Sequence, residues 1–489
     1  MKTTLATISI LLTSCCGLLA TSFTPNPDIN GSWTHTENGV TYSKDSFGFY
    51  VVDVDDQLSG TVRIYDRYYT TTIGTTRYYA FTLGGLPDGL WANGGPDNNI
   101  VVVDGFGTPS DVLEGCDQIT KLEIGQRFAS GAYAALFSDC SALEEVEVYK
   151  HIDNEVSPGV ISVTTTGTTP SDVEFSDNGV PYNTSGLIYY PAAKTDLSYT
   201  VPASVESIGN EAFYYSKTTP LETIILPTNI ETIGERAFQS HDNLRNVQFP
   251  ASMSSLTIGR YAFAALTLNS LPTFNATSLH FGDNSFSTLS GTAPLTLTFG
   301  PNVNEIIFGD FSFGNAPFLT LNLPNADIEF RPDAFSNAAI ETLTFPTGAS
   351  NREIEIAPFA FWSIEAENVD FGDAKVILRH LAFARADLKF IHLGPQTRFD
   401  TFYAWRKKDY LDSSSPSSDI FSPFDDTLVR SFTVSPSNPY FRAIDGVLYN
   451  KDLTELVIYP KFKAGTEFIV PEGVETIKSR AFYDADNLR

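Results

Sequence analysis

The sequence is poor in cysteine, in basic residues and in long hydrophobic runs. Only four Cys, two Met and four Trp occur among 489 residues, and 31 Lys and Arg stand against 58 Asp and Glu, a net charge of −27. Binding to nucleic acid needs cations that neutralise phosphates, and no Lys/Arg cluster offers them, so we expect no nucleic-acid partner. The acidic balance is typical of a protein that stays soluble outside the cell, or of one with a cationic ligand.

Catalytic and cofactor motifs are also missing from the sequence. None of the six His has metalloprotease or zinc spacing, and there is no Gly-x-Ser-x-Gly elbow, no phosphate-binding Gly-Lys-Ser/Thr loop and no dinucleotide fingerprint. We therefore expect a protein that is not an enzyme and has no cofactor and no metal site. One alternative stays open, a secreted hydrolase with its site in residues 23–111, because the carboxylate pair of a glycosidase has no fixed spacing in sequence.

Residues 1–22 have the features of a secretory signal peptide. Lys2 gives the charged start, and residues 5–12 form an apolar core too short to span a bilayer. Residues 12–15 (LTSC) also resemble a bacterial lipobox, in which case Cys15 carries a lipid. No later segment reaches 18 uninterrupted apolar residues. We expect membrane attachment only through that lipid or through a C-terminal anchor that the sequence does not include.

Phenylalanine is abundant, with 37 residues, and much of it recurs at a regular distance. Nine segments share one rule: an apolar residue stands five positions before a Phe, and Ala or Ser stands immediately before it. Successive Phe anchors of the first eight copies lie 22 to 27 residues apart. The copies are Ile208/Ala212/Phe213, Ile233/Ala237/Phe238, Ile258/Ala262/Phe263, Phe281/Ser285/Phe286, Phe308/Ser312/Phe313, Phe330/Ala334/Phe335, Ile356/Ala360/Phe361, Leu378/Ala382/Phe383 and Ile477/Ala481/Phe482.

Most copies are followed by a short apolar alternation that Pro or Gly closes, as in residues 221–227 (LETIILP) and 340–346 (IETLTFP). Alternation with a period of two predicts a strand with one buried face. One such coil cannot bury its own apolar face, whereas stacked coils bury a continuous core. We therefore predict a solenoid with a parallel β-sheet, in which each coil supplies one Phe to a stack along the axis.

A second pattern occurs twice, in residues 178–202 and 445–471. Both segments contain Gly-Val-x-Tyr-Asn, then an apolar strand to Tyr-Pro, then a second strand to Val-Pro, which predicts a hairpin-like variant of the coil. The two patterns together resemble the BspA-like leucine-rich repeat proteins, clearly over residues 171–394 and 431–489. This resemblance implies leucine-rich-repeat coils, export or display at the cell surface, and adhesion or host binding without shared catalytic residues.

These patterns divide the chain into five expected segments. A signal peptide (1–22) precedes a β-rich N-terminal cap or small domain (23–111), and the repeat solenoid covers 112–400. A Ser/Pro-rich loop (401–430) interrupts the array, which continues over 431–489. Because the last copy stops before its strand, we expect the natural protein to continue or to be truncated here.

Cys116 and Cys140 lie in similar contexts, 24 residues apart, which suggests neighbouring coils. Strands of neighbouring coils lie about 4.8 Å apart, within the range of Cα distances that a disulfide spans. A disulfide between them is therefore feasible, and two buried free thiols are the alternative.

The outward face of the stacked strands is the candidate binding surface. Its side chains are short, mostly uncharged and able to hydrogen-bond, which suits extended binding of an extracellular protein or a polysaccharide. The alternatives are a solvated strand face in which Thr only favours β structure, and a structural spacer. One expected row is Thr223, Asn246, Ser278, Thr296, Thr320, Thr342, Asn368 and Phe390, and the other is Ile225, Gln248, His280, Thr298, Asn322, Thr344, Asp370 and His392.

Overall fold

The structure, a computed structural model, describes residues 119–125, 134–149, 176–183, 186–291, 295–348, 351–400 and 421–489, and the backbone of the strands that precede residue 104. The chain forms two compact units, Met1–Thr195 with Ile208–Thr219, and Asp196–Ser207 with Pro220–Arg489. Strands dominate both units, and the helix in the described ranges is a single 3-10 turn, η1 (Ala134–Phe137). Among these residues there is no helix with the length and hydrophobicity that a membrane span requires.

The first unit contains a parallel four-stranded sheet in the order β11-β10-β9-β6. Val62, Ile100, Leu122 and Val146 occupy one register position across its strands. The strands β6 and β9 lie within residues 23–111, the region expected to form a cap. The expected boundary between cap and solenoid at residue 112 remains a prediction. The strands of the unit are β1 (Ile8–Ser9), β2 (Ser22–Phe23), β3 (Trp33–Glu37), β4 (Val40–Lys44), β5 (Phe49–Val54), β6 (Thr61–Tyr65), β7 (Thr71–Ile73), β8 (Thr76–Tyr78), β9 (Asn99–Val103), β10 (Lys121–Gly125), β11 (Glu145–Tyr149), β12 (Ser176–Asp177), β13 (Val180–Asn183) and β14 (Gly186–Leu187).

Aromatic rings fill the described core of this unit. Tyr189 stacks on Phe137 with ring centroids 4.6 Å apart, and Tyr190 stacks on Phe213 at 4.9 Å. All four side chains are buried. The Phe anchor of the first repeat copy therefore lies in the core, as predicted.

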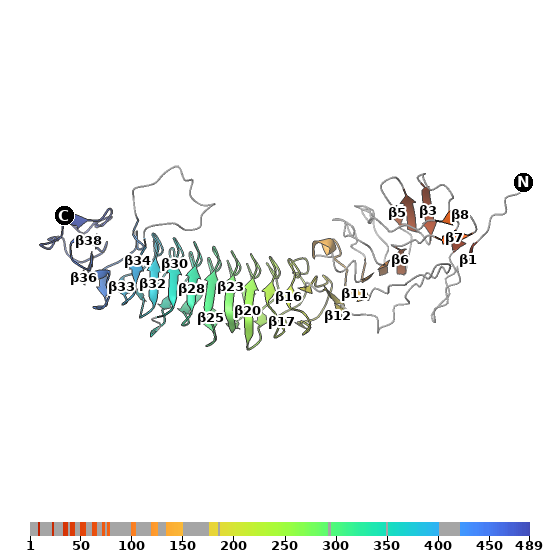
Figure 1. Cartoon of the computed structure of the whole chain (residues 1–489), viewed down its shortest axis with the longest axis horizontal. Helices are drawn as coiled ribbons and strands as arrows, with labels where there is room; N and C mark the ends of the chain where they lie inside the picture. The colour runs from red at the N-terminus through yellow and green to blue at the C-terminus, as the bar shows by residue number, and fades with distance from the viewer. Residues whose placement is uncertain are drawn as a thin grey trace, which may run out of the picture. The chain divides into compact units, whose positions relative to one another are not determined.

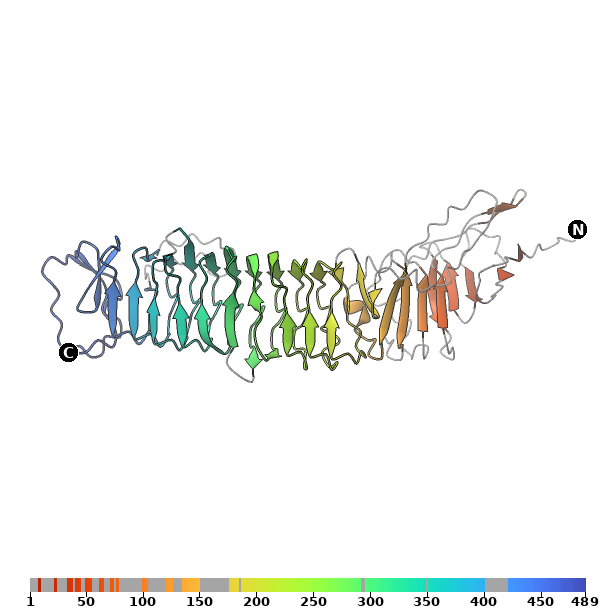
Figure 2. The same ribbon diagram turned by 90° about the horizontal axis from the view of Figure 1, so that it is seen from below.

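The second unit is a solenoid whose coils each contribute strands to two parallel sheets. Figures 1 and 2 show the strands of its successive coils side by side in rows. The first sheet, here the charged sheet, has the order β18 (Thr232–Ile233), β20 (Met253–Ile258), β23 (Ala276–Phe281), β26 (Glu305–Phe308), β28 (Asp327–Phe330), β30 (Glu353–Ile356), β32 (Lys375–Leu378) and β34 (Arg398–Phe399). Its strands contain or end at the apolar residues five positions before each Phe, and β16 (Ser207–Ile208) holds that of the first copy.

The second sheet, here the ladder sheet, contains most of the strands that the sequence predicts, such as the one in residues 340–346. Its order is β22 (Thr273–Phe274), β25 (Leu295–Phe299), β27 (Phe318–Asn322), β29 (Thr342–Thr344), β31 (Asn368–Asp370), β33 (Phe390–Leu393) and β35 (Ser431–Val434). A separate sheet of the earlier coils consists of β15 (Ser198–Thr200), β17 (Thr223–Ile225) and β19 (Asn246–Gln248). The short pair β21 (Thr267–Leu268) and β24 (Ser290–Gly291) lies in coils of irregular sequence.

The charged sheet and the ladder sheet contact each other across the core through their inward side chains. Phe274 of the ladder sheet meets Phe281 of the charged sheet edge-on at 5.0 Å, and Phe299 meets Phe308 at 6.4 Å. The sequence predicted one strand in each coil, and the structure shows two. Both types of strand alternate apolar and polar residues because each buries one face.

Eight Phe rings form a continuous stack between the two sheets, here the Phe spine. Neighbouring ring centroids lie 4.9 to 5.6 Å apart, and neighbouring ring planes differ by 1 to 24°. The predicted stacking is confirmed for the anchors from Phe238 to Phe383, whereas Phe482 of the ninth copy stacks on Tyr459 instead, with ring centroids 5.0 Å apart. Phe424, which lies in the range expected to be a loop, continues the stack beyond Phe383. The rings are those of Phe238, Phe263, Phe286, Phe313, Phe335, Phe361, Phe383 and Phe424.

The turn around each spine Phe from Phe238 to Phe383 has a left-handed residue two positions before the Phe and another two positions after it. In the coil of Phe286 these are Asn284 and Thr288, with φ of 56° and 53°. The amides of the Phe and of these two residues each donate a hydrogen bond to the next coil, at 2.7 to 2.9 Å. A left-handed non-glycine residue costs on the order of 1–3 kcal/mol, so the bonds between coils are needed to hold this backbone.

The C-terminal segment ends in a small mixed sheet of β36 (Phe441–Ile444), β37 (Val447–Asn450), β38 (Glu455–Ile458) and β39 (Thr476–Ile477). Asp445 and Gly446 join the first two strands with φ of 48° and 77°. Asn178 and Gly179 do the same between β12 and β13, with φ of 50° and 75°. Positive φ at both central residues is the condition for a tight hairpin turn with Asn-Gly or Asp-Gly. Both segments therefore contain a hairpin, but the second strand predicted before Pro471 is not present, because residues 467–470 have no strand assignment.

Candidate ligand-binding face

The outward side chains of the ladder sheet form two rows of mostly polar groups, here the polar ladder. Inward residues such as Leu321, Leu343 and Val369 are buried, so their neighbours along each strand point to solvent. Successive rungs are separated by the spacing of parallel strands, about 4.8 Å. Register places Thr296, Thr320, Thr342, Asn368, Phe390 and Ser431 in one row, and Asn322, Thr344, Asp370, His392 and Thr433 in the other; Thr298 is the outward residue of β25 in this second row.

The ladder offers many hydrogen-bonding groups and little charge. Asp370 is the acidic side chain in its rows, and its Oδ1 accepts a hydrogen bond from the amide of Gly372 at 2.9 Å. His392 Nδ1 lies 2.9 Å from Thr433 Oγ1 on the next strand. Phe390 is half exposed and gives the surface one aromatic ring. An extended ligand would therefore meet a regular series of hydroxyl and amide groups with one apolar contact.

Thr223, Asn246 and Gln248 lie in the separate sheet β15-β17-β19. Thr223 pairs in register with Asn246, and Asn246 Nδ2 donates to Thr223 Oγ1 at 3.4 Å. Asn269 continues this series, because its Nδ2 donates to Asn246 Oδ1 at 3.3 Å. These residues form a shorter polar face of the same chemical character.

The predicted placement of Ser278 and His280 in these rows is corrected. Both residues lie in β23 of the charged sheet, where His280 pairs with Thr257 and Ile307. The physical reason is that strands of both sheets alternate in the same way and end at a glycine or proline. The ladder strand of this coil is β22, in which Thr273 Oγ1 lies 3.0 Å from Thr298 Oγ1.

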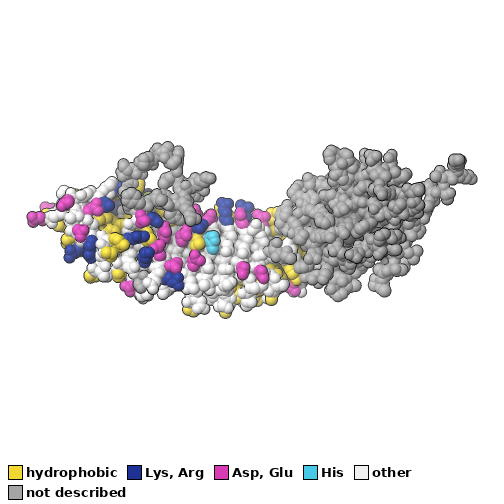
Figure 3. Space-filling view, viewed as in Figure 1, with side chains coloured by type: hydrophobic (Ala, Val, Ile, Leu, Met, Phe, Trp, Pro, Cys, Tyr) yellow, Lys and Arg dark blue, Asp and Glu magenta, His cyan; other side chains and the backbone are white. Residues whose placement is uncertain are grey.

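The outward face of the charged sheet differs from the ladder in chemistry. Lys375 forms an ion pair with Glu353, and Arg379 bridges Glu355 at 2.7 Å and Asp400 at 2.8 Å. These pairs connect residues of neighbouring coils. On the face drawn in Figure 3, basic and acidic side chains of the described residues are interspersed, so no large area of one sign is present there. Such paired charges are mutually satisfied and suit a structural role.

Titratable groups with shifted pKa values lie at the C-terminal ends of β23 and β26 in the charged sheet. Burial, reinforced by the nearby Asp283 carboxylate, raises the pKa of Asp310 to about 6. Asp283 Oδ1 accepts a hydrogen bond from the amide of Asp310 at 3.0 Å. Burial also lowers the pKa of His280, with Arg331 as the next cause. Within the described ranges, no three His, Cys, Asp or Glu side chains are grouped so that they could hold a metal ion.

Several predicted sites remain predictions. Cys140 is a buried free thiol, and Cys116 lies outside the described residues, as does the proposed lipid site at Cys15. The same holds for the side chains of residues 23–111, where the alternative hydrolase site was placed.

Comparison with known proteins identifies the repeats. Residues 197–293 and 291–407 match the BspA type leucine rich repeat region, in six copies. No curated protein matches the sequence.

Solved structures with some likeness are bacterial repeat proteins. A leucine-rich repeat protein from Eubacterium ventriosum shares 14% identity over 73% of this chain and 95% of that chain, with a TM-score of 0.31. A leucine rich cell surface protein from Faecalibacterium prausnitzii shares 14% over 83% and 96%, with a TM-score of 0.25. The pneumococcal vaccine antigen PcpA shares 14% over 67% and 93%, with a TM-score of 0.20.

Proposed function

We propose that the chain is an exported or cell-surface protein that binds an extracellular protein or polysaccharide without catalysis, since residues 197–407 match the BspA type leucine rich repeat region. Adhesion is the role that fits this activity. The observation that carries the proposal is the polar ladder, whose hydrogen-bonding side chains keep register from β25 to β35.

The ladder suits a ligand that is itself periodic or extended. Its side chains are short, so they lose little conformational entropy when a ligand orders them. Most of these side chains are exposed and uncharged, so binding a ligand removes few charged groups from water. Phe390 supplies an apolar anchor beside Asn368 in register. The charged sheet has instead its acidic and basic groups engaged with one another.

The test uses the full chain on arrays of immobilised extracellular-matrix proteins and polysaccharides. The double variant Thr320→Lys/Thr342→Lys places two long cations on adjacent rungs of the ladder. We expect it to reduce binding to the captured array component at least tenfold. The matched control is Thr232→Lys/Thr257→Lys, an exposed Thr pair on adjacent strands of the charged sheet.

Two results contradict the proposal. If both double variants bind as well as the unmodified chain, the ladder is not the binding face. If the unmodified chain captures no component of the arrays, a structural spacer is the better description of this solenoid.

A further inference from the structure

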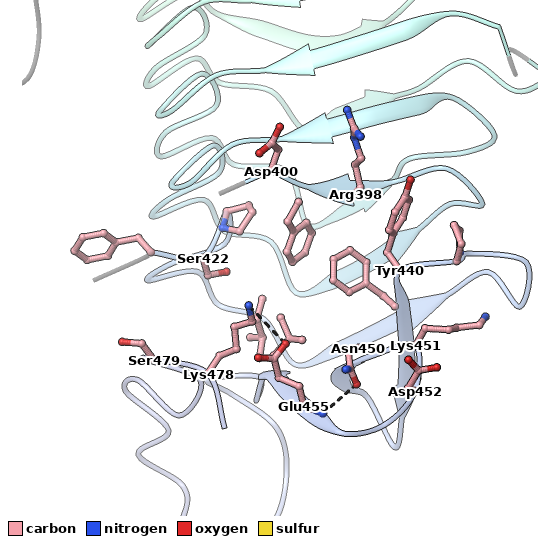
Figure 4. A pocket seen from close by; sticks show the side chains of 17 residues that line it. Arg398, Asp400, Ser422, Tyr440, Asn450, Lys451, Asp452, Glu455, Lys478 and Ser479 are labelled. Carbon is pink, nitrogen blue, oxygen red and sulfur yellow. Dashed lines mark hydrogen bonds and ion pairs between the residues drawn. The ribbon is translucent and has the colours of Figure 1, made fainter. Parts of the chain in front are cut away.

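A pocket of about 580 Å³ opens where the last coil of the regular array meets the C-terminal sheet. In Figure 4, Arg398, Asp400 and Tyr440 lie at one side of it, and Asn450, Asp452 and Glu455 lie at the other. The pocket is formed by β34, residues 421–423, the start of β36, the turn between β37 and β38, and the residues after β39. None of these residues belongs to the polar ladder.

Aromatic rings form part of the wall of this pocket. Phe399 of β34 packs against Phe441 of β36 with ring centroids 4.4 Å apart. Tyr440 lies beside Phe441 at 6.4 Å, and its side chain is 45% exposed. An exposed ring beside a buried one is an apolar platform with a polar hydroxyl at its end.

Arg398 supplies a cationic group to the lining of the pocket. Its Nε is buried and has no hydrogen-bond partner among the described residues. Because this Nε is buried, a ligand in the pocket can reach only the two terminal nitrogens of the guanidinium, which form no ion pair among the described residues. A carboxylate is the acceptor that matches the planar guanidinium best, because it accepts two parallel hydrogen bonds.

The other two cations that line the described part of the pocket already have partners. Lys478 lies 3.5 Å from Glu455. Lys451 donates to the backbone carbonyls of Pro436 at 3.0 Å and Asn438 at 2.6 Å. Arg398 is therefore the cation of this pocket that can still pair with a ligand, and it can hold a single carboxylate.

The carboxylates of the pocket restrict the ligand further. Asp400 is paired with Arg379, and Glu455 with Lys478, while Asp452 is exposed at the turn after β37. Three acidic groups in a chain of net charge −27 repel a ligand with several negative charges. The same oxygens accept hydrogen bonds from hydroxyl groups. A sugar ring combines hydroxyl groups with an apolar face that can lie against Tyr440.

We propose that this pocket binds a saccharide residue that carries one carboxylate. Arg398 holds the carboxylate, the ring of Tyr440 covers the apolar face of the sugar, and Asp452 and Glu455 accept hydrogen bonds from its hydroxyl groups. This site goes beyond the function proposed above and does not depend on the ladder.

The test compares glucuronic acid with glucose, which has the same ring but no carboxylate, by saturation-transfer NMR and titration with the full chain. We expect glucuronic acid to bind at least tenfold more tightly, since a hydrogen-bonded charge pair distinguishes the two. Arg398→Gln should remove this preference, and Tyr440→Ala should weaken both sugars. The matched control is Arg352→Gln, whose guanidinium pairs with Asp327 away from the pocket.

Several outcomes overturn the proposal. The first is equal binding of glucuronic acid and glucose. The second is an unchanged preference for glucuronic acid in Arg398→Gln, provided that its thermal melt matches that of Arg352→Gln. The third is tighter binding of an acetylated Asp-Asp peptide than of glucuronic acid. Retained discrimination in Thr320→Lys/Thr342→Lys supports a site separate from the ladder. Failure of the array experiment with success here would overturn the ladder function alone.

Discussion

Phe286 and Phe313 stack face to face, with ring centroids 5.0 Å apart and ring planes 1° from parallel. They are 27 residues apart in the chain and belong to neighbouring coils. Both side chains are buried, and each also stacks on the next ring of the Phe spine. The spine therefore links the successive coils of the second unit from Phe238 to Phe424.

Removal of one ring from the middle of the spine should be strongly destabilising. We expect Phe313→Ala to lower the free energy of unfolding by about 3–5 kcal/mol, because it removes a buried ring and leaves a cavity between two others. Urea unfolding followed by circular dichroism measures this. Phe390→Ala on the exposed ladder should change stability by less than about 0.5 kcal/mol, and equal losses in the two variants would contradict the stacked core.

A buried histidine should make the solenoid sensitive to acid. Burial lowers the pKa of His241 to about 4 from an ordinary value of 6.5. Between these pH values the unfolded chain binds a proton that the folded chain does not. Stability should therefore fall by up to about 3 kcal/mol as the pH drops from 6.5 to 4.

The variant His241→Leu isolates this effect. Leu266 and Leu289 occupy the corresponding place, three residues after the spine Phe, in the next two coils. We expect His241→Leu to flatten the dependence of the urea midpoint on pH between 6.5 and 4. An unchanged slope would show that other groups cause the acid sensitivity.

Two coils carry serine where most have alanine before the spine Phe. Ser312 is fully buried, and its hydroxyl has no hydrogen-bond partner in the described structure. Ser312→Ala should therefore raise stability by about 1 kcal/mol, since it removes an unsatisfied polar group. Ser336→Ala is the control, because the Ser336 hydroxyl bonds to Asp333 and this variant should lose stability.

The left-handed turn residues allow a reciprocal test. Thr288 has φ of 53°, a conformation that strains a β-branched side chain, while Asn337 has φ of 54° at the same place two coils later. Thr288→Asn should gain about 1 kcal/mol, and Asn337→Thr should lose a similar amount. Thermal melts of both variants measure this, and shifts of the same sign would contradict the assigned backbone.

The sequence predicts the coil length and the Phe spine because buried Phe recurs in every layer. It does not distinguish the two sheets, since a segment such as residues 277–282 alternates like a ladder strand, and the prediction for His280 therefore names the wrong sheet. The left-handed pairs have no sequence signal, because Glu211, Arg236 and Phe311 share that position. Phe424 was missed because Pro423 stands where other copies have Ala or Ser.

The pocket at the C-terminal sheet could not be predicted from sequence either. Its residues come from separate parts of the chain, and the packing of the last coil against the hairpin brings them together. The sequence indicates a hairpin-like element in residues 445–471 through the repeated Gly-Val-x-Tyr-Asn pattern, but it does not show where this element packs. The lining side chains, such as Arg398 and Tyr440, belong to no recurring pattern.

Disulfide formation between introduced cysteines tests the geometry of the ladder most directly. The experiment uses a chain in which the four native cysteines are replaced by alanine. Thr320 and Thr342 are register partners on adjacent strands, so Thr320→Cys/Thr342→Cys should crosslink completely under mild oxidation. Thr320→Cys/Glu329→Cys joins residues nearer in sequence but on different sheets, and it should stay reduced. A crosslink in the second pair and none in the first would contradict the stacked coils and the binding face built on them.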